Sequence, residues 1–249
     1  MKVLFLCAGY ATRLYPLTLD KPKPLLPVGG KPILDYLLEK VEKIPEVDEV
    51  YVVTNQKFAS NFENWAAKKK LRFQVRVFND RTLTNETRLG AVGDMQFVIE
   101  EAKLNDDLLV IAGDNLFEFD LNDFVKKAKQ KGILIAARYI ENLEDMKRYG
   151  EIEKDEDGKI IYLKEKPENP RSHLAASCVY FFKKESLSYI KKYLDEGNNP
   201  DQPGRYIEWL YKKVPVFVYE FREKWYDIGN MDQYKKADEE YSRRRNEKI

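Results

Sequence analysis

Apolar, strand-like runs alternate with segments of helical periodicity over the first half of the chain. Strands are predicted at Val3–Cys7, Glu49–Thr54, Phe73–Phe78, Leu108–Ala112 and Ile133–Arg138. The helical segments between them are Ile33–Ile44, Lys57–Lys68, Leu89–Ala102 and Asn122–Lys131. Strand and helix at this spacing are typical of βαβ units. The pattern therefore predicts an α/β protein, a three-layer α/β/α fold of Rossmann-like type whose central sheet is mostly parallel.

After Arg138 the rhythm changes to that of an antiparallel region. The segments Gly150–Lys154 and Lys159–Lys164 flank an Asp-Gly turn and predict a hairpin. The remaining predicted elements are a long strand His173–Phe182, helices Lys184–Leu194 and Arg205–Lys213, a strand Val214–Phe221 and a helix from Met231 to near the end. No internal repeat or flexible linker interrupts them. We therefore expect a single domain over 1–249 with two lobes, 1–115 and 116–249.

The net charge bears on which partners to expect, and the cysteine content on the cellular compartment. Lysine and arginine number 43 against 42 aspartates and glutamates, a net charge of +1, so nucleic acid is not expected as a partner. The two cysteines, Cys7 and Cys178, lie in apolar runs and suit core positions in a reducing compartment. No run is apolar enough to cross a membrane, and no cleavable leader begins the chain. We expect a cytoplasmic protein without a membrane partner.

A turn of small residues follows the first predicted strand. Gly9 and Ala11 stand where the carboxyl end of a parallel strand meets ligand, and Arg13 and Lys23 add fixed positive charge. Small residues let backbone N–H groups approach phosphates closely. A tight turn with solvated cations explains the same residues, and neither standard nucleotide loop is present. On these residues alone, a phosphate cradle and a structural turn remain open.

Two aspartates follow strands that are far apart in the sequence. Asp114 comes directly after the strand Leu108–Ala112, and Asp227 follows Val214–Phe221. A pair of carboxylates suits Mg²⁺, which takes few protein ligands and keeps places for phosphate oxygens and water. Each aspartate alone fits an exposed loop or a helix cap equally well.

A wider set of motifs resembles one enzyme family. The stretch from Leu6 to Thr18, followed by Lys21-Pro22-Lys23-Pro24-Leu25-Leu26-Pro27-Val28, closely resembles the signature of the sugar-phosphate nucleotidylyltransferases, or NDP-sugar pyrophosphorylases. Three later segments occur in the family's order: Ala112-Gly113-Asp114-Asn115, Tyr149-Gly150 through Glu165-Lys166-Pro167, and Trp225-Tyr226-Asp227-Ile228-Gly229. The resemblance covers nearly the whole chain, although Ala11 stands where the family usually has glycine.

The resemblance implies a role for each of these residues. It makes 1–115 the nucleotide-binding lobe and 116–249 the sugar-phosphate-binding lobe. The implied nucleotide-binding residues are Ala8, Gly9, Tyr10, Ala11, Thr12, Leu89 and Gly90, and the implied catalytic residues are Arg13 and Lys23. The implied sugar-phosphate contacts are Tyr149, Gly150, Glu165 and Lys166, and the implied Mg²⁺ ligands are Asp114 and Asp227. Thr84-Asn85-Glu86-Thr87-Arg88 departs from the family where the base is read.

The expected reaction joins an NTP and a sugar 1-phosphate into an NDP-sugar with release of pyrophosphate. The resemblance favours dTTP or UTP and glucose 1-phosphate, in a possible homo-oligomer without an appended left-handed β-helix. Three alternatives stay open: a cytidylyltransferase acting on phosphocholine or an alditol phosphate, a glycosyltransferase that uses an NDP-sugar, and a non-catalytic homologue. A glycosyltransferase usually carries Asp-x-Asp at a strand end, and Asp155-Glu156-Asp157 lies in the predicted hairpin turn. The only histidine, His173, is expected at the surface.

Overall fold

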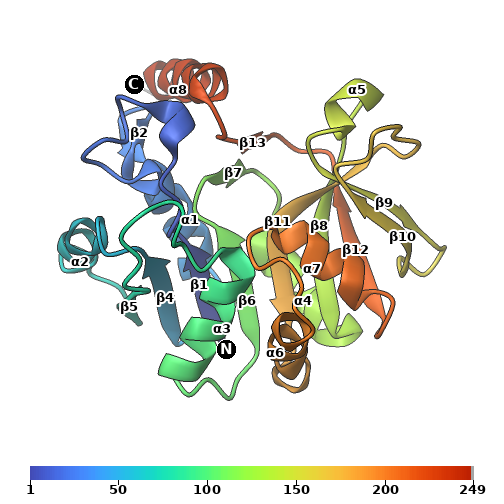
Figure 1. The fold of residues 1–249 in the computed structure, drawn as a ribbon. Helices are drawn as coiled ribbons and strands as arrows, with labels where there is room; N and C mark the ends of the chain where they lie inside the picture. The colour runs from blue at the N-terminus through green and yellow to red at the C-terminus, as the bar shows by residue number, and fades with distance from the viewer. Residues whose placement is uncertain (248–249) are drawn as a thin grey trace.

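A computed structural model describes residues 1–247 and has a nine-stranded sheet at its centre (Figure 1). Along the main path the strand order is β10-β9-β11-β6-β1-β4-β5, and β8 pairs with both β11 and β12. The strands of this sheet are β1 Lys2–Leu6, β4 Glu49–Thr54, β5 Gln74–Asn79, β6 Leu108–Ala112, β8 Ile133–Tyr139, β9 Gly150–Lys154, β10 Ile160–Glu165, β11 Leu174–Phe182 and β12 Val216–Phe221.

The half of the sheet built from the early part of the chain is parallel. β1 pairs in parallel with β4 and with β6, and β4 pairs in parallel with β5. β11 then runs antiparallel to β6, β8 and β9, and β9 and β10 form the hairpin around Gly158. The structure confirms the predicted Rossmann-like parallel sheet with an added antiparallel region.

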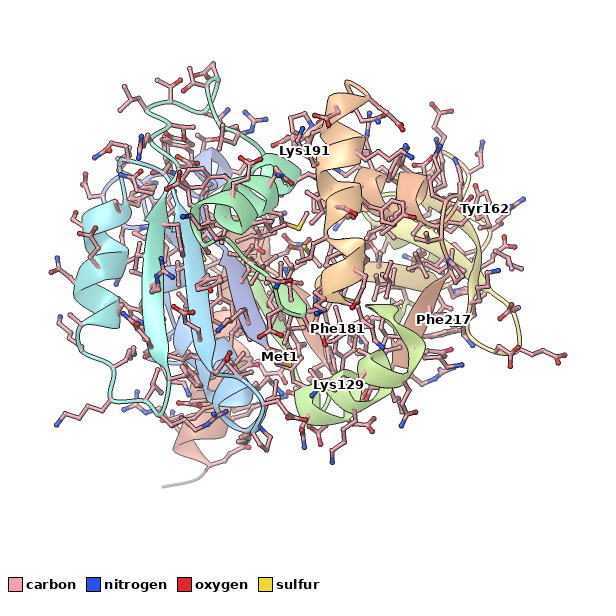
Figure 2. The ribbon with its side chains drawn as sticks, turned by 90° about the horizontal axis from the view of Figure 1, so that it is seen from below. Met1, Lys129, Tyr162, Phe181, Lys191 and Phe217 are labelled. Atoms are coloured by element: carbon pink, nitrogen blue, oxygen red, sulfur yellow. The ribbon has the colours of Figure 1, made fainter. Side chains whose placement is uncertain are left out.

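Helices cover both faces of the sheet. Apolar side chains alternate along β1, so Val3 and Phe5 pack under one layer and Leu4 under the other. One layer consists of α1 Ile33–Glu42, α2 Ala59–Ala66 and α4 Leu121–Lys131, and the other of α3 Ala91–Glu101, α6 Ser188–Asp195 and α7 Pro203–Leu210. Seen from below, Phe181 lies inside the molecule and Lys191 on the outer side of α6 (Figure 2). The predicted three layers are confirmed.

The long elements match their predicted positions within a few residues. β4 and β6 have the predicted bounds, and Gly132 ends α4 with a φ of 97°, as its place after that helix predicts. The predicted helix Lys184–Leu194 divides into a 3₁₀ turn, Lys184–Ser186, and α6. Pro32 is the residue immediately before α1 and pairs in a short strand.

Several short elements carry no periodic signal and were not predicted. They are the 3₁₀ turns Thr12–Leu14 and Lys23–Leu25, the strands β2 Pro27–Val28, β3 Lys31–Pro32, β7 Asn115–Phe117 and β13 Trp225–Asp227, and the helix α5 Leu143–Met146. The last helix, α8 Met231–Asn246, returns to pack beside β2 (Figure 1). Within residues 1–247, no helix combines the length and apolarity that a membrane crossing needs.

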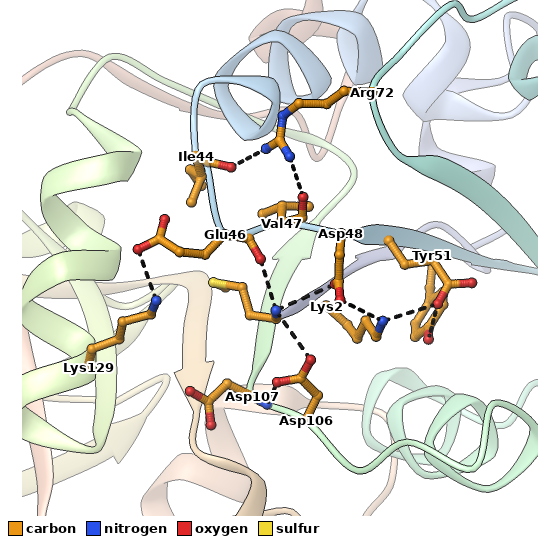
Figure 3. Close-up of polar contacts among 12 residues, drawn as sticks. Lys2, Ile44, Glu46, Val47, Asp48, Tyr51, Arg72, Asp106, Asp107 and Lys129 are labelled. Carbon is orange, nitrogen blue, oxygen red and sulfur yellow. Dashed lines mark hydrogen bonds and ion pairs between the residues drawn. The ribbon is translucent and has the colours of Figure 1, made fainter.

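Ion pairs hold the amino end of β1. The terminal amine of Met1 donates to Glu46 O over 2.9 Å and lies 3.4 Å from Asp48 and 3.2 Å from Asp106 (Figure 3). Lys2 adds contacts to Asp48 and Glu49. Since this end of the strand is tied down, its carboxyl end has a fixed position from which to present the loop at 8–14.

Candidate active site

A cavity of about 450 Å³ lies at the carboxyl ends of β1 and β6, the edge where open α/β sheets bind ligands. It collects most of the residues that the sequence singled out, from both halves of the chain. Those lining it are Ala8, Gly9, Ala11, Arg13, Lys23, Gly90, Asp114, Tyr149, Gly150, Glu165, Lys166 and Asp227. Tyr10, Thr12 and Leu89 belong to the same loops but are not among the lining residues.

The loop after β1 opens toward the cavity. Gly9 is exposed, and a Cβ built on it would have no heavy atom within 4 Å. No other part of the described protein therefore requires glycine there, and the space stays free for a ligand beside the backbone. Ala11 has a φ of 49°, a left-handed conformation that disfavours side chains, and Thr18 Oγ1 donates to its carbonyl over 2.8 Å.

Tyr10 turns away from the cavity. Its side chain is buried, and its hydroxyl donates to Thr82 O over 3.1 Å. The contact ties the loop after β1 to the segment after β5, which leads into the predicted base-reading residues. Tyr10 thus acts on the shape of the site, rather than through a side chain in the cavity.

Lys23 fixes one wall of the cavity. Its Nζ lies 2.5 Å from Asp114 Oδ2 and donates to Ile228 O over 2.9 Å. Asn115 Nδ2 donates to the other oxygen, Asp114 Oδ1, over 2.9 Å. Both oxygens of Asp114 are therefore held by hydrogen bonds.

The short strands β7 and β13 bring the two predicted metal ligands together. They pair antiparallel, with Asp227 opposite Asn115, so the segment after β12 lies beside the end of β6. Trp225 Nε1 donates to Asn115 Oδ1 over 2.5 Å and reinforces the pairing. This contact between distant segments could not be read from either strand alone, since each is only three residues long.

The two aspartates differ in their proton affinity. Burial raises the pKa of Asp114, but the charge and hydrogen bond of Lys23 outweigh it and hold that pKa below its usual range. Burial and the neighbouring charge of Asp114 raise the pKa of Asp227 to about 6, against the lowering effect of Lys23 and Arg13. Asp227 thus lacks the close cation that Asp114 has.

These carboxylates fit a hard divalent cation that also binds phosphate. The side chain of Asp227 has no ion pair within the described residues. A second positive charge beside Asp114 would offset the repulsion that raises the pKa of Asp227. No group of three or more His, Cys, Asp or Glu side chains gathers for a metal within residues 1–247. Two carboxylates with the remaining places left to phosphate and water match the coordination of Mg²⁺.

The opposite wall carries the residues assigned to the sugar phosphate. Lys166 has a φ of 48°, and its N–H donates to Tyr149 O over 3.0 Å. A non-glycine residue in this left-handed region stores strain, which is common at functional positions. Burial raises the pKa of Glu165, whose carboxyl group lies against Gly150 and Gly204. The ring of Tyr149 packs 4.9 Å from that of Trp225.

The predicted base-reading segment packs against the loop before α7. Gly90 has a φ of 80°, and a Cβ there would lie 2.6 Å from Asp201 Cα and from Pro200 O. Arg88 spans the same contact, with Nε 2.8 Å from Asp201 Oδ1 and Nη2 3.0 Å from Oδ2. The segment that departs from the family pattern is therefore joined to the loop before α7.

Several lining residues were missed at the sequence level. They are Arg88, Asp94, Arg148, Asp201, Gly204 and Trp225. Arg88 and Trp225 lie in segments that the sequence singled out, but neither was assigned a role. Charged residues in loops and first helical turns are common, so the pattern did not mark Asp94, Arg148 or Asp201. One signal was available: Asp94 interrupts the apolar positions of the helix between Val92 and Met95.

Two other predictions can be placed in the structure. Asp155-Glu156-Asp157 forms the turn between β9 and β10, where Gly158 N donates to Asp155 O over 3.1 Å, and it does not line the cavity. His173 is half-buried rather than fully at the surface, because its ring stacks on Tyr139 and its Nδ1 lies 2.7 Å from Ile140 O. Cys7 is buried as expected, whereas Cys178 is half-buried and lines the cavity.

Comparison with known proteins identifies a family for the chain. The sequence model of the nucleotidyl transferase family matches residues 2–244. Over 229 residues, 92% of the chain, the sequence is 31% identical to the bifunctional protein GlmU of Methanocaldococcus jannaschii and 33% identical to a Sulfolobus acidocaldarius protein named as a mannose-1-phosphate guanyltransferase. The match spans 51% and 60% of those relatives' own lengths.

Solved structures share the fold at lower identity. A UDP-glucose pyrophosphorylase in complex with UDP-glucose superposes with a TM-score of 0.79 and 24% identity, covering 98% of each chain. At that identity the likeness shows the arrangement of strands and helices, and the residues of the cavity carry the argument about chemistry.

Proposed function

Since the chain belongs to the nucleotidyl transferase family, we propose that it transfers a nucleotidyl group from an NTP to a sugar 1-phosphate. The products are an NDP-sugar and pyrophosphate. The observation that carries the proposal is the convergence of Lys23, Asp114, Asp227 and Lys166 on one cavity from four separate segments. Cations on two walls suit a reaction between two phosphate compounds.

The reaction needs alignment and charge neutralisation more than proton transfer. An oxygen of the sugar phosphate attacks the α-phosphorus in line, a new P–O bond forms, and the bond to the β-phosphate oxygen breaks with its electron pair on pyrophosphate. A phosphate monoester has a second pKa of about 6, so the nucleophile is largely dianionic near neutral pH without a general base. The residues of the cavity then act by position and charge.

Each cation has a place in this scheme. Arg13, exposed on the loop after β1, holds the β- and γ-phosphates and stabilises the leaving pyrophosphate. Lys23, fixed by Asp114 and Ile228 O, contacts the α-phosphate. Lys166 orients the sugar phosphate, and Glu165 accepts hydrogen bonds from sugar hydroxyls. Asp114 and Asp227 would hold Mg²⁺, which supplies further charge neutralisation when bound.

The favoured substrates are dTTP or UTP and glucose 1-phosphate, and this choice rests on the family resemblance. A phosphocholine or alditol phosphate acceptor would use the same phosphate contacts. An NDP-sugar-dependent glycosyltransferase is less well supported, because its expected Asp-x-Asp lies in the β9–β10 turn. A non-catalytic homologue would bind nucleotide in this cavity without releasing pyrophosphate.

Replacing Arg13 tests the proposal. Arg13→Ala should lower the rate of pyrophosphate release by roughly 10²–10³-fold, the typical effect of removing one preorganised charge from the transition state. The residue is exposed, so circular dichroism and thermal unfolding should be unchanged. Arg243→Ala, an exposed arginine on α8, is the matched control and should keep wild-type activity. Near-normal turnover by Arg13→Ala would contradict the assignment.

A further inference from the structure

Asp94 is a buried carboxyl group in the wall of the cavity that the proposed reaction leaves without a role. It is the fourth residue of α3, in the first turn of the helix, and lines the cavity together with Gly90 and Ala91. The residue is 5% exposed, and its Oδ1 is fully buried without a hydrogen-bond partner among the described residues. Burying a carboxyl group without partners costs stability, so a functional reason is expected.

Asp80 lies beside Asp94. Asp80 Oδ1 accepts hydrogen bonds from the N–H and the hydroxyl of Thr82, each over 2.7 Å, whereas its Oδ2 is buried and unpartnered. Burial, and then the charge of Asp80, raise the pKa of Asp94 to about 8. One proton between the two carboxyl groups satisfies the side of Asp94 that faces Asp80. Asp94 Oδ2 is neither fully buried nor hydrogen-bonded among the described residues, so it is the oxygen that offers the cavity a hydrogen-bond acceptor.

We propose that Asp94 selects the nucleobase by accepting a hydrogen bond from a ring N–H. The inference rests on the proposed function and adds a determinant of base specificity to it. Two short backbone segments of small residues line the cavity together with Asp94: Gly90-Ala91 at the start of α3, and Ala8-Gly9 after β1. A Cβ on Gly9 would meet no protein atom within 4 Å, so this side of the cavity has room for a flat ring.

The proposal separates the bases by their hydrogen-bonding edges. Uracil, thymine and guanine each carry a hydrogen on a ring nitrogen of the pairing edge, whereas cytosine and adenine carry a lone pair there. A carboxyl oxygen attracts the first group and repels the ring nitrogen of the second, so discrimination includes a repulsive element. UTP and CTP give the sharpest contrast, because they differ only at ring positions 3 and 4.

The test compares UTP and CTP in wild type and in Asp94→Ala. We measure kcat/KM for pyrophosphate release with each nucleotide at a fixed concentration of glucose 1-phosphate. Wild type should prefer UTP, and the UTP/CTP ratio should fall by roughly 10- to 100-fold in Asp94→Ala, the effect of losing a hydrogen bond to a charged or strongly polar group. An unchanged ratio, or a wild-type preference for CTP, would overturn the proposal.

Matched variants separate specificity from folding. Asp94→Asn keeps the shape and adds an N–H donor that can face cytosine N3, so CTP should gain relative to UTP. Asp123→Ala removes an aspartate from the first turn of α4, which is outside the cavity, and should leave the ratio unchanged. Thermal unfolding of each variant shows whether it is folded.

A binding measurement distinguishes failure of this inference from failure of the proposed function. If wild type releases no pyrophosphate with any NTP, the transfer reaction is wrong. Calorimetric titration with UTP and CTP then still tests Asp94, since base selection requires tighter binding of UTP to wild type and loss of that preference in Asp94→Ala. Equal binding of both nucleotides to wild type would overturn the inference independently of turnover.

Discussion

Three residues that line the cavity are unusual: Ala11 and Lys166 in their backbone conformation, and Asp94 in its pKa. Ala11 and Lys166 both have left-handed backbone angles, with φ of 49° and 48°. Such angles cost L-amino acids about 1–2 kcal/mol each relative to the right-handed form. The sequence identified Ala11 as unusual because the family resemblance supplied a glycine for comparison, but it gave no such comparison for Lys166.

Glycine at position 11 should relieve this strain. Ala11→Gly should raise the free energy of unfolding in urea by about 0.5 kcal/mol, since the strain relieved exceeds the extra backbone entropy of glycine in the unfolded chain. Ala67→Gly is the control, because Ala67 has a right-handed φ of −59°. That substitution should destabilise by about 0.5–1 kcal/mol. A stability loss of similar size in both variants would show that the loop is not strained.

The raised pKa of Asp94 gives the protein a dependence of stability on pH. Folding raises this pKa from 3.8 to about 8, so the folded state binds more protons than the unfolded state between those values. Stability from this group is fully present below pH 3.8 and is lost as pH rises to about 8. The expected slope is up to about 1.4 kcal/mol per pH unit within the window.

Asp94→Asn removes this titration. Its stability relative to wild type, measured by urea unfolding at pH 5 and at pH 8, should therefore increase with pH. The charged or polar groups that face Asp94 in the structure are Asp80, Asp201 and the thiol of Cys7, and all three remain in the variant. Equal differences between wild type and variant at the two pH values would contradict the raised pKa.

Short elements position the site, and long elements only support it. The periodic strands and helices were predictable because each buries an apolar stripe or face that repeats at its own spacing. β7 and β13 carry no such signal, and their pairing is a contact between residues about a hundred positions apart. The ion pair between Arg88 and Asp201 likewise joins residues that are far apart in the sequence. The sequence therefore identified most of the residues that share the cavity, but not the segments that bring them together.

Substitutions at two glycines that line the cavity should change the KM values of the two substrates separately. A Cβ on Gly204 would overlap the carboxyl group of Glu165, so Gly204→Ala should displace that group and raise the KM for sugar 1-phosphate. A Cβ on Gly9 meets no protein atom, so Gly9→Ala should fold normally yet raise the KM for NTP by crowding the phosphates. Steady-state kinetics with each substrate varied in turn measures the split. Parallel changes in both KM values would count against separate subsites.

At the scale of the whole molecule, residues from both halves of the chain, among them the cations proposed to bind phosphate, line one cavity. Arg13 comes from the loop after β1, Lys23 from the 3₁₀ turn Lys23–Leu25 and Lys166 from the segment after β10, while Asp114 follows β6. The last helix, α8, returns to the first part of the chain, where Asp238 Oδ1 accepts a hydrogen bond from Gly29 N over 2.8 Å. The lobe boundary near residue 115 stays a prediction, as do the choice of base and sugar.

The most direct measurement is the initial rate of pyrophosphate release by the purified protein with an NTP, glucose 1-phosphate and Mg²⁺. The rate should require both substrates, fall when Mg²⁺ is chelated, and be highest with UTP or dTTP among the common nucleotides. The NDP-sugar should appear in equal amount to pyrophosphate. Tight nucleotide binding without pyrophosphate release, across the common NTPs and a panel of sugar 1-phosphates, would contradict the account.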